Sequence, residues 1–89
     1  MNETEKLSIT RREYDALNEI RGLQEDAHHM VILAKCDEKG RYTLEGAPET
    51  FRSLSSDLFE EIYYELSPAS RRRHLARLYD RLNPDCGEF

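Results

Sequence analysis

Histidine and cysteine are the side chains of this sequence that could bind a metal ion. Zinc needs three or four such ligands converging at about 2.0–2.3 Å. His29 and Cys36 would share one face of a helix, but seven residues at about 1.5 Å each place their backbones about 10 Å apart. The chain has neither the C-x-x-C nor the H-E-x-x-H spacing of metal-binding motifs. We therefore expect no metal site and no cofactor from the soft ligands, which are His28, His29, Cys36, His74 and Cys86.

Serine and acidic residues offer no clearer route to catalysis. A nucleophilic serine or cysteine would need a neighbouring base and an oxyanion hole. The serines of this chain are instead typical of helix surfaces and helix caps, and the acidic pair Glu60-Glu61 is typical of a solvated helix face. A helical chain of 89 residues also leaves little room for a pocket of roughly 300 Å³. The sequence therefore favours a protein that is not an enzyme.

Charge is distributed unevenly along the chain. The 18 acids and 13 basic residues give a net charge of −5, which disfavours indiscriminate binding to nucleic acids or membranes. Residues 49–66 contain five acids and one arginine, whereas residues 67–83 contain five arginines and one acid. One interpretation is that these two segments neutralise each other across a helix pair. The other is that Arg73, Arg77 and Arg81, which share the side of a helix away from the core, contact phosphates or an acidic partner.

Two tyrosines in the acidic segment are candidates for a protein-binding surface. Tyr64 falls on the acidic side of the expected helix, and Tyr63 lies at the margin of its apolar face. A tyrosine surrounded by acids often anchors an interface, because its ring offers a large contact area and its hydroxyl a hydrogen bond. The candidate surface consists of Asp57, Glu60, Glu61, Tyr63 and Tyr64.

A second candidate surface is apolar. The run over residues 30–34 is hydrophobic on every side of a helix, since Ile32 and Leu33 point away from the main apolar stripe. A second copy of the chain would cover these two side chains, which predicts self-association as a homodimer. The alternative is that Tyr42 and Leu44 fold back over the helix end within one chain.

Local signals position these residues on expected helices. Thr10 and Glu13 have the spacing of a capping box, which begins a first helix over residues 11–36. Gly40 can adopt the left-handed conformation that closes a helix or a turn. Residues 41–44 then form an extended connector, because one short strand has no partner in the sequence.

The second half of the chain is expected to hold two more helices. Pro48 begins a second helix over residues 49–66, because proline fits the first helical turn. Ser67 and Pro68 end that helix and begin a third over residues 68–82. Residues 1–9 are expected to be a flexible arm and residues 84–89 a tail.

These signals together predict an all-α fold. We expect a small three-helix domain over residues 10–83, in which the first two helices form a long antiparallel hairpin and the third is shorter. No apolar run approaches the roughly 20 residues of a membrane span, and the amino-terminal residues do not have the order of a signal peptide. Two cysteines fit a reducing cytoplasm.

The function expected from the sequence is that of a small cytoplasmic protein-interaction module. Such a module would act as a regulator, inhibitor or adaptor by binding a protein partner, and it would self-associate through Ile32 and Leu33. The alternative is a nucleic-acid-binding regulator that uses the arginines of the third helix.

Overall fold

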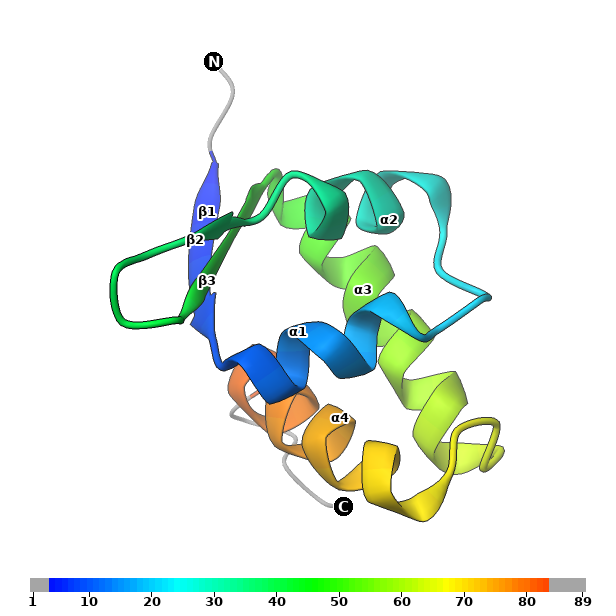
Figure 1. Cartoon of the computed structure of the whole chain (residues 1–89). Helices are drawn as coiled ribbons and strands as arrows, with labels where there is room; N and C mark the ends of the chain where they lie inside the picture. The colour runs from blue at the N-terminus through cyan, green and yellow to red at the C-terminus, as the bar shows by residue number, and fades with distance from the viewer. Residues whose placement is uncertain (1–3, 84–89) are drawn as a thin grey trace.

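The computed structural model describes residues 4–83, and within them the chain forms four helices and three strands (Figure 1). In chain order the elements are β1 (Glu5–Ile9), α1 (Arg11–Asn18), α2 (Glu25–Ile32), β2 (Lys35–Cys36), β3 (Tyr42–Gly46), α3 (Pro48–Tyr63) and α4 (Ala69–Leu82). α3 packs against both α2 and α4, and α1 packs across α4. Each helix in this range is too short or too polar to cross a membrane.

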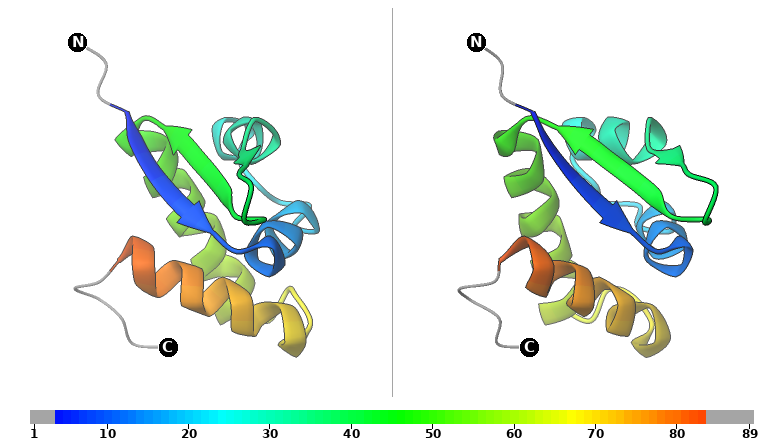
Figure 2. Two further views of the ribbon diagram at one scale, coloured as in Figure 1. Left: turned by 60° about the vertical axis from the view of Figure 1, so that its left-hand side comes forward. Right: turned by 90° about the vertical axis from the view of Figure 1, so that its left-hand side faces the viewer.

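β3 is the central strand of an antiparallel sheet. It pairs with β1 on one side, where Ile9 lies opposite Tyr42, and with β2 on the other. Figure 2 shows β1 and β3 running side by side. Ile9 and Leu44 are fully buried in the same core as the helix side chains. On the other face of the sheet, which is polar, Lys6 and Glu45 form an ion pair at 3.9 Å.

The expectation of an all-α, three-helix domain is wrong, because segments expected to be an arm and a connector form this sheet. Residues 5–9 of the expected flexible arm are β1, and most of the connector over residues 41–44 belongs to β3. β1 and β3 are far apart along the chain, so no local hairpin signal joins them. Gly40 adopts the expected left-handed conformation, with a φ of +79°, in the turn between β2 and β3.

The expected helix over residues 11–36 is interrupted, so the long antiparallel hairpin does not form. α1 ends at Asn18 and α2 begins at Glu25. Asp57 of α3 explains where α2 begins: its carboxylate accepts hydrogen bonds from the backbone N–H of Gln24 at 2.9 Å and from the Gln24 side-chain amide at 3.2 Å. Because Gln24 is the N-cap of α2, this carboxylate satisfies a donor at the positive end of the helix dipole.

Several of the local predictions are confirmed. The capping box is present, with the Glu13 N–H donating to the Thr10 hydroxyl at 3.2 Å and the Thr10 N–H donating to the Glu13 carboxylate at 2.8 Å. α3 begins at Pro48, and α4 covers almost all of the expected third helix. α3 ends at Tyr63, three residues before the expected end at residue 66. The expected tail over residues 84–89 lies outside the described residues.

A buried carboxylate joins the two ends of the described chain. Glu13 is 6% exposed, and besides the Thr10 N–H its carboxylate accepts a hydrogen bond from the Arg81 guanidinium at 2.5 Å. The other terminal nitrogen of Arg81 donates to the backbone carbonyl of Ser8 at 2.9 Å. The last turn of α4 is therefore fixed to the junction between β1 and α1.

Replacing Arg81 by glutamine should lower the free energy of unfolding by about 2 kcal/mol, because it leaves a buried carboxylate short of a charged partner. Urea unfolding followed by circular dichroism measures this change. Arg77→Gln is the matched control, since Arg77 is exposed one turn earlier on the same helix, and it should shift the value by less than about 0.5 kcal/mol. Equal losses in both variants would show that Arg81 has no special structural role.

Candidate functional site

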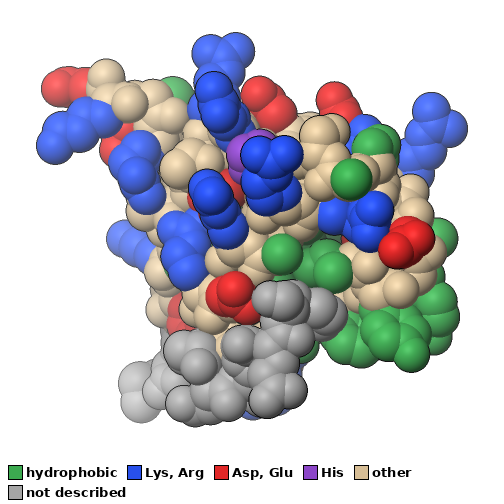
Figure 3. Space-filling model, turned by 90° about the horizontal axis from the view of Figure 1, so that it is seen from below, with side chains coloured by type: hydrophobic (Ala, Val, Ile, Leu, Met, Phe, Trp, Pro, Cys, Tyr) green, Lys and Arg blue, Asp and Glu red, His purple; other side chains and the backbone are tan. Residues whose placement is uncertain are grey.

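An exposed group of aromatic side chains lies at the carboxyl end of α3. Tyr63 and Tyr64 each expose 64% of their surface. Tyr63 stacks on Phe59 with ring centres 5.4 Å apart, and Tyr64 meets Tyr63 edge to face at 5.1 Å. Leu66, which follows them, exposes 62%. We call Phe59, Tyr63, Tyr64 and Leu66 the aromatic cluster, and Figure 3 shows hydrophobic side chains gathered at the end of the molecule where α3 and α4 meet.

The way in which α3 ends determines how Leu66 is presented. The chain leaves the helix through Glu65, which has a φ of +53°, and the Leu66 N–H donates to the carbonyl of Glu61 at 3.1 Å. This is the Schellman turn, in which the left-handed position usually holds glycine. A hydrophobic residue after such a turn commonly packs back on its helix, but Leu66 remains exposed. The turn therefore holds an apolar side chain in solvent beside the two tyrosines.

The acids that the sequence analysis grouped with the tyrosines separate in the structure. Glu60 is exposed, whereas Asp57 and Glu61 are buried. Asp57 holds the start of α2 through Gln24, and the Glu61 carboxylate accepts a hydrogen bond from the hydroxyl of buried Ser67 at 2.5 Å. Two of the three candidate acids are thus engaged within the fold, and only Glu60 lies on the same surface as the tyrosines.

The apolar candidates at the end of α2 are both on the surface. Ile32 exposes 54% and Leu33 exposes 74% of its surface. Leu44 is buried in the core, and Tyr42 stacks on Tyr14 with ring centres 3.8 Å apart. β3 therefore completes the core within one chain, but it leaves Ile32 and Leu33 in solvent.

The five arginines of α4 fall into two groups. In residues 4–83, Arg73 and Arg77 are exposed and form no ion pair with another residue. The other three form ion pairs, which are Arg71 with Glu19, Arg72 with Glu65, and Arg81 with Glu13. Two of these acids belong to the segment around α1, so only Arg72–Glu65 is an ion pair between segments 49–66 and 67–83 among the described residues.

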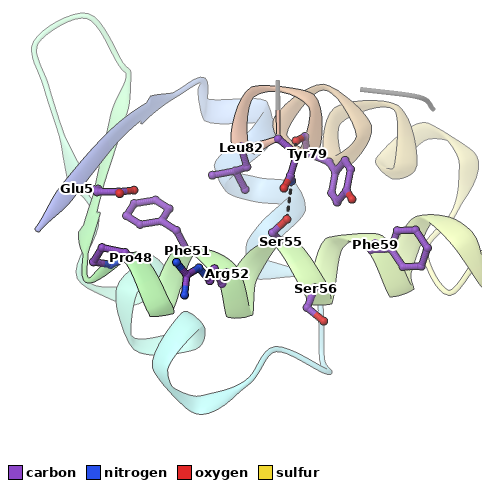
Figure 4. Close-up of a pocket in the computed structure, with 10 residues that line it drawn as sticks. Glu5, Pro48, Phe51, Arg52, Ser55, Ser56, Phe59, Tyr79 and Leu82 are labelled. Atoms are coloured by element: carbon purple, nitrogen blue, oxygen red, sulfur yellow. Dashed lines mark hydrogen bonds between the residues drawn. The ribbon is translucent and has the colours of Figure 1, made fainter. Parts of the chain in front are cut away.

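A groove of about 450 Å³ lies between α3 and α4 (Figure 4). The expectation that the chain leaves little room for a pocket of roughly 300 Å³ is therefore wrong, because this groove is larger than that. Phe51, Tyr79 and Leu82 supply apolar lining, and the Ser55 hydroxyl accepts a hydrogen bond from the Asn83 amide at 2.5 Å. Neither histidine nor cysteine is found among the described residues that line it.

The soft metal ligands are dispersed. Among residues 4–83, no three histidine, cysteine or acidic side chains are grouped so that they could hold a metal ion. Cys36 lies opposite Tyr42 across the sheet, and loss of hydration together with this thiol raises the pKa of Tyr42 above its ordinary value of 10. The other candidate ligands are His28 and His29, exposed on α2; His74, half-buried on α4; and Cys86, which lies outside the described residues.

Helical spacing alone would place two members of the aromatic cluster on the core face of α3. Phe59 and Leu66 continue the apolar spacing of α3, but the helix ends before Leu66 and turns toward α4. A signal was present, because Phe59 lies one turn before Tyr63 and the Ser67-Pro68 pair closely follows Leu66.

No family model, curated protein or solved structure matches this chain.

Replacing Asp57 by alanine should lower the free energy of unfolding by about 2 kcal/mol, because two donors of Gln24 lose their acceptor. Urea unfolding again provides the measurement. Glu60→Ala removes an exposed acid from the same helix and should change the value by less than about 0.5 kcal/mol. If the two variants were equally stable, the carboxylate of Asp57 would be available for a role outside the fold.

Proposed function

We propose that this chain is a protein-interaction module that binds a protein partner through the aromatic cluster. The observation that carries the proposal is the exposure of Tyr63 and Tyr64, which contact each other at the surface and are each 64% exposed. The two cysteines fit the reducing cytoplasm in which we expect the module to act.

The physical basis of the proposal is the energy available from covering these rings. Tyrosine is enriched among the residues that dominate protein interfaces, because it buries a large area at a low cost in side-chain entropy. Leu66 adds apolar surface, and exposed Glu60 lies in the same helix one turn before Tyr64. A partner that covers the cluster would bury apolar surface at its centre and leave charge at its edge, which is the usual composition of an interface.

Replacing Tyr63 and Tyr64 together by alanine should weaken binding of the native partner by about 30-fold or more, since residues of this kind often contribute about 2 kcal/mol. Tagged wild-type and variant proteins would be compared by quantitative mass spectrometry of the proteins that they retain from the native host. His28→Ala/His29→Ala is the matched control, because it also removes two adjacent exposed rings from a helix.

The informative result is a protein retained by the wild type and by the histidine control but lost from the tyrosine variant. The variant should keep its far-UV circular dichroism spectrum, because both tyrosines project from the surface. Retention of every wild-type partner by the folded tyrosine variant would contradict a role for the cluster in binding.

We also propose self-association through Ile32 and Leu33. Both side chains are more than half exposed at the carboxyl end of α2, and full burial of such a side chain is worth about 1.5–3 kcal/mol. A two-fold dimer would bring the same patch from each copy together.

The double variant Ile32→Glu/Leu33→Glu should convert a dimer into a folded monomer, because it places four charges in the two-fold interface. Sedimentation equilibrium at micromolar to millimolar concentration measures the mass. His28→Glu/His29→Glu adds the same charges to the same helix and should leave the dimer intact. A wild-type protein that stays monomeric over this range would eliminate the proposal.

A further inference from the structure

The unpaired arginines of α4 form part of a positively charged surface. Arg73 and Arg77 are four residues apart, which places them about 6 Å apart along the helix axis. Like charges at this spacing on a helix repel each other. The chain has 18 acids, and the other three arginines of α4 form ion pairs with them. The fold therefore leaves this pair exposed and uncompensated within residues 4–83, although acids are abundant.

The adjoining groove between α1 and α4 adds Arg12 and His74 to these arginines. It has a volume of about 250 Å³, and its charged lining comes from both helices and the residues that flank them. Its two acids are each paired with an arginine, Asp15 with Arg11 at 3.9 Å and Glu19 with Arg71. Besides these acids and Arg71, the groove is lined by exposed Arg12 and half-buried His74. Neither of these two side chains forms an ion pair within residues 4–83.

We call Arg12, Arg73, His74 and Arg77 the basic surface. Figure 3 shows many lysine and arginine side chains on the face of the molecule seen from below, with most of the hydrophobic side chains at its right-hand end. Asp80 follows Arg77 by one turn on α4, and it forms no ion pair with either arginine. The local charge is thus positive on a protein whose net charge is −5.

We infer that the basic surface binds an acidic segment of a protein partner, with two carboxylates about one helical turn apart facing Arg73 and Arg77. Guanidinium groups bind carboxylates through paired, charge-assisted hydrogen bonds, so each arginine is suited to one carboxylate. This inference rests on the proposed function, because it assigns the chemistry of a segment of the protein partner.

A protein segment fits this surface better than a nucleic acid does. Arg81 is bound by the buried Glu13, so the arginine row that faces solvent is shorter than the sequence indicates. Nucleic-acid binders commonly neutralise six to ten phosphates along a continuous backbone. Here Asp15 and Glu19 lie beside Arg12 in the groove and would face the continuing line of phosphates.

Titration of isotope-labelled protein with synthetic peptides and an oligonucleotide tests the inference. The first probe is an alanine-based helical peptide of about 16 residues with glutamates four residues apart, and the second is the same peptide with lysines in their place. The third is a twelve-nucleotide DNA duplex at the same ionic strength. Amide shifts in the nuclear magnetic resonance spectrum report both affinity and location.

The expected result is saturable binding of the glutamate peptide, with the largest shifts at residue 12 and residues 73–77 and none from the lysine peptide. The variant Arg73→Gln/Arg77→Gln should bind the glutamate peptide about tenfold more weakly, whereas Arg21→Gln/Arg52→Gln, which removes two exposed arginines elsewhere, should bind it within about twofold of the wild type.

Other outcomes overturn the inference. Equal weakening of glutamate-peptide binding in both variants, or amide shifts spread over the whole molecule, would show that the basic surface is not a specific binding site. Tighter binding of the duplex than of the glutamate peptide, with a steep dependence on salt, would assign the surface to nucleic acid instead. These peptides do not require the aromatic cluster, so failure here is distinct from failure of the tyrosine experiment.

Discussion

The buried carboxylate of Glu13 is the interaction on which the arrangement of this chain depends. It accepts hydrogen bonds from the Thr10 N–H and from Arg81, so one side chain both begins α1 and holds the last turn of α4 against it. A buried charge is stable only when it is paired and hydrogen-bonded. Removing either partner leaves the free-energy cost of its desolvation uncompensated. The hydrogen bond from Arg81 to the Ser8 carbonyl also attaches the end of β1 to α4. The position of α1 across α4 follows from this constraint.

Two further buried acids act in the same way at the other element junctions. Asp57 connects α3 to the start of α2 through Gln24, and Glu61 connects the end of α3 to Ser67 before α4 begins. The protein therefore uses carboxylates inside a small core to set the relative positions of short helices. This leaves the exposed surface of the carboxyl end of α3 to aromatic and apolar side chains, with Glu60 as the remaining exposed acid of the predicted set.

The features that were predicted correctly are those coded by neighbouring residues. The Thr10–Glu13 capping box, the start of α3 at Pro48 and the span of α4 each depend on residues within one or two turns. The pairing of β1 was missed because its partner β3 lies far along the chain. The break before α2 was missed because the acceptor for Gln24, the Asp57 carboxylate, lies far along the chain in α3. For the same reason, helical spacing indicated the exposure of Tyr64 but could not tell which acids a neighbouring element would bind in the interior.

The aromatic cluster lies beside one flank of α4, whereas the basic surface covers the solvent-facing side of α4 and the groove on its other flank. On the flank toward α3, the ring centre of Tyr79 lies 6.2 Å from that of Phe59 in the aromatic cluster. On the flank toward α1, His74 lines the groove between α1 and α4. A partner that reached both surfaces would have to extend from the α3 side of α4 onto its solvent-facing side. In such a complex, apolar burial at the tyrosines would supply most of the affinity, because exposed charge pairs contribute little to it. The arginines would act mainly on the rate of encounter and on orientation, so the two contributions separate in their dependence on salt.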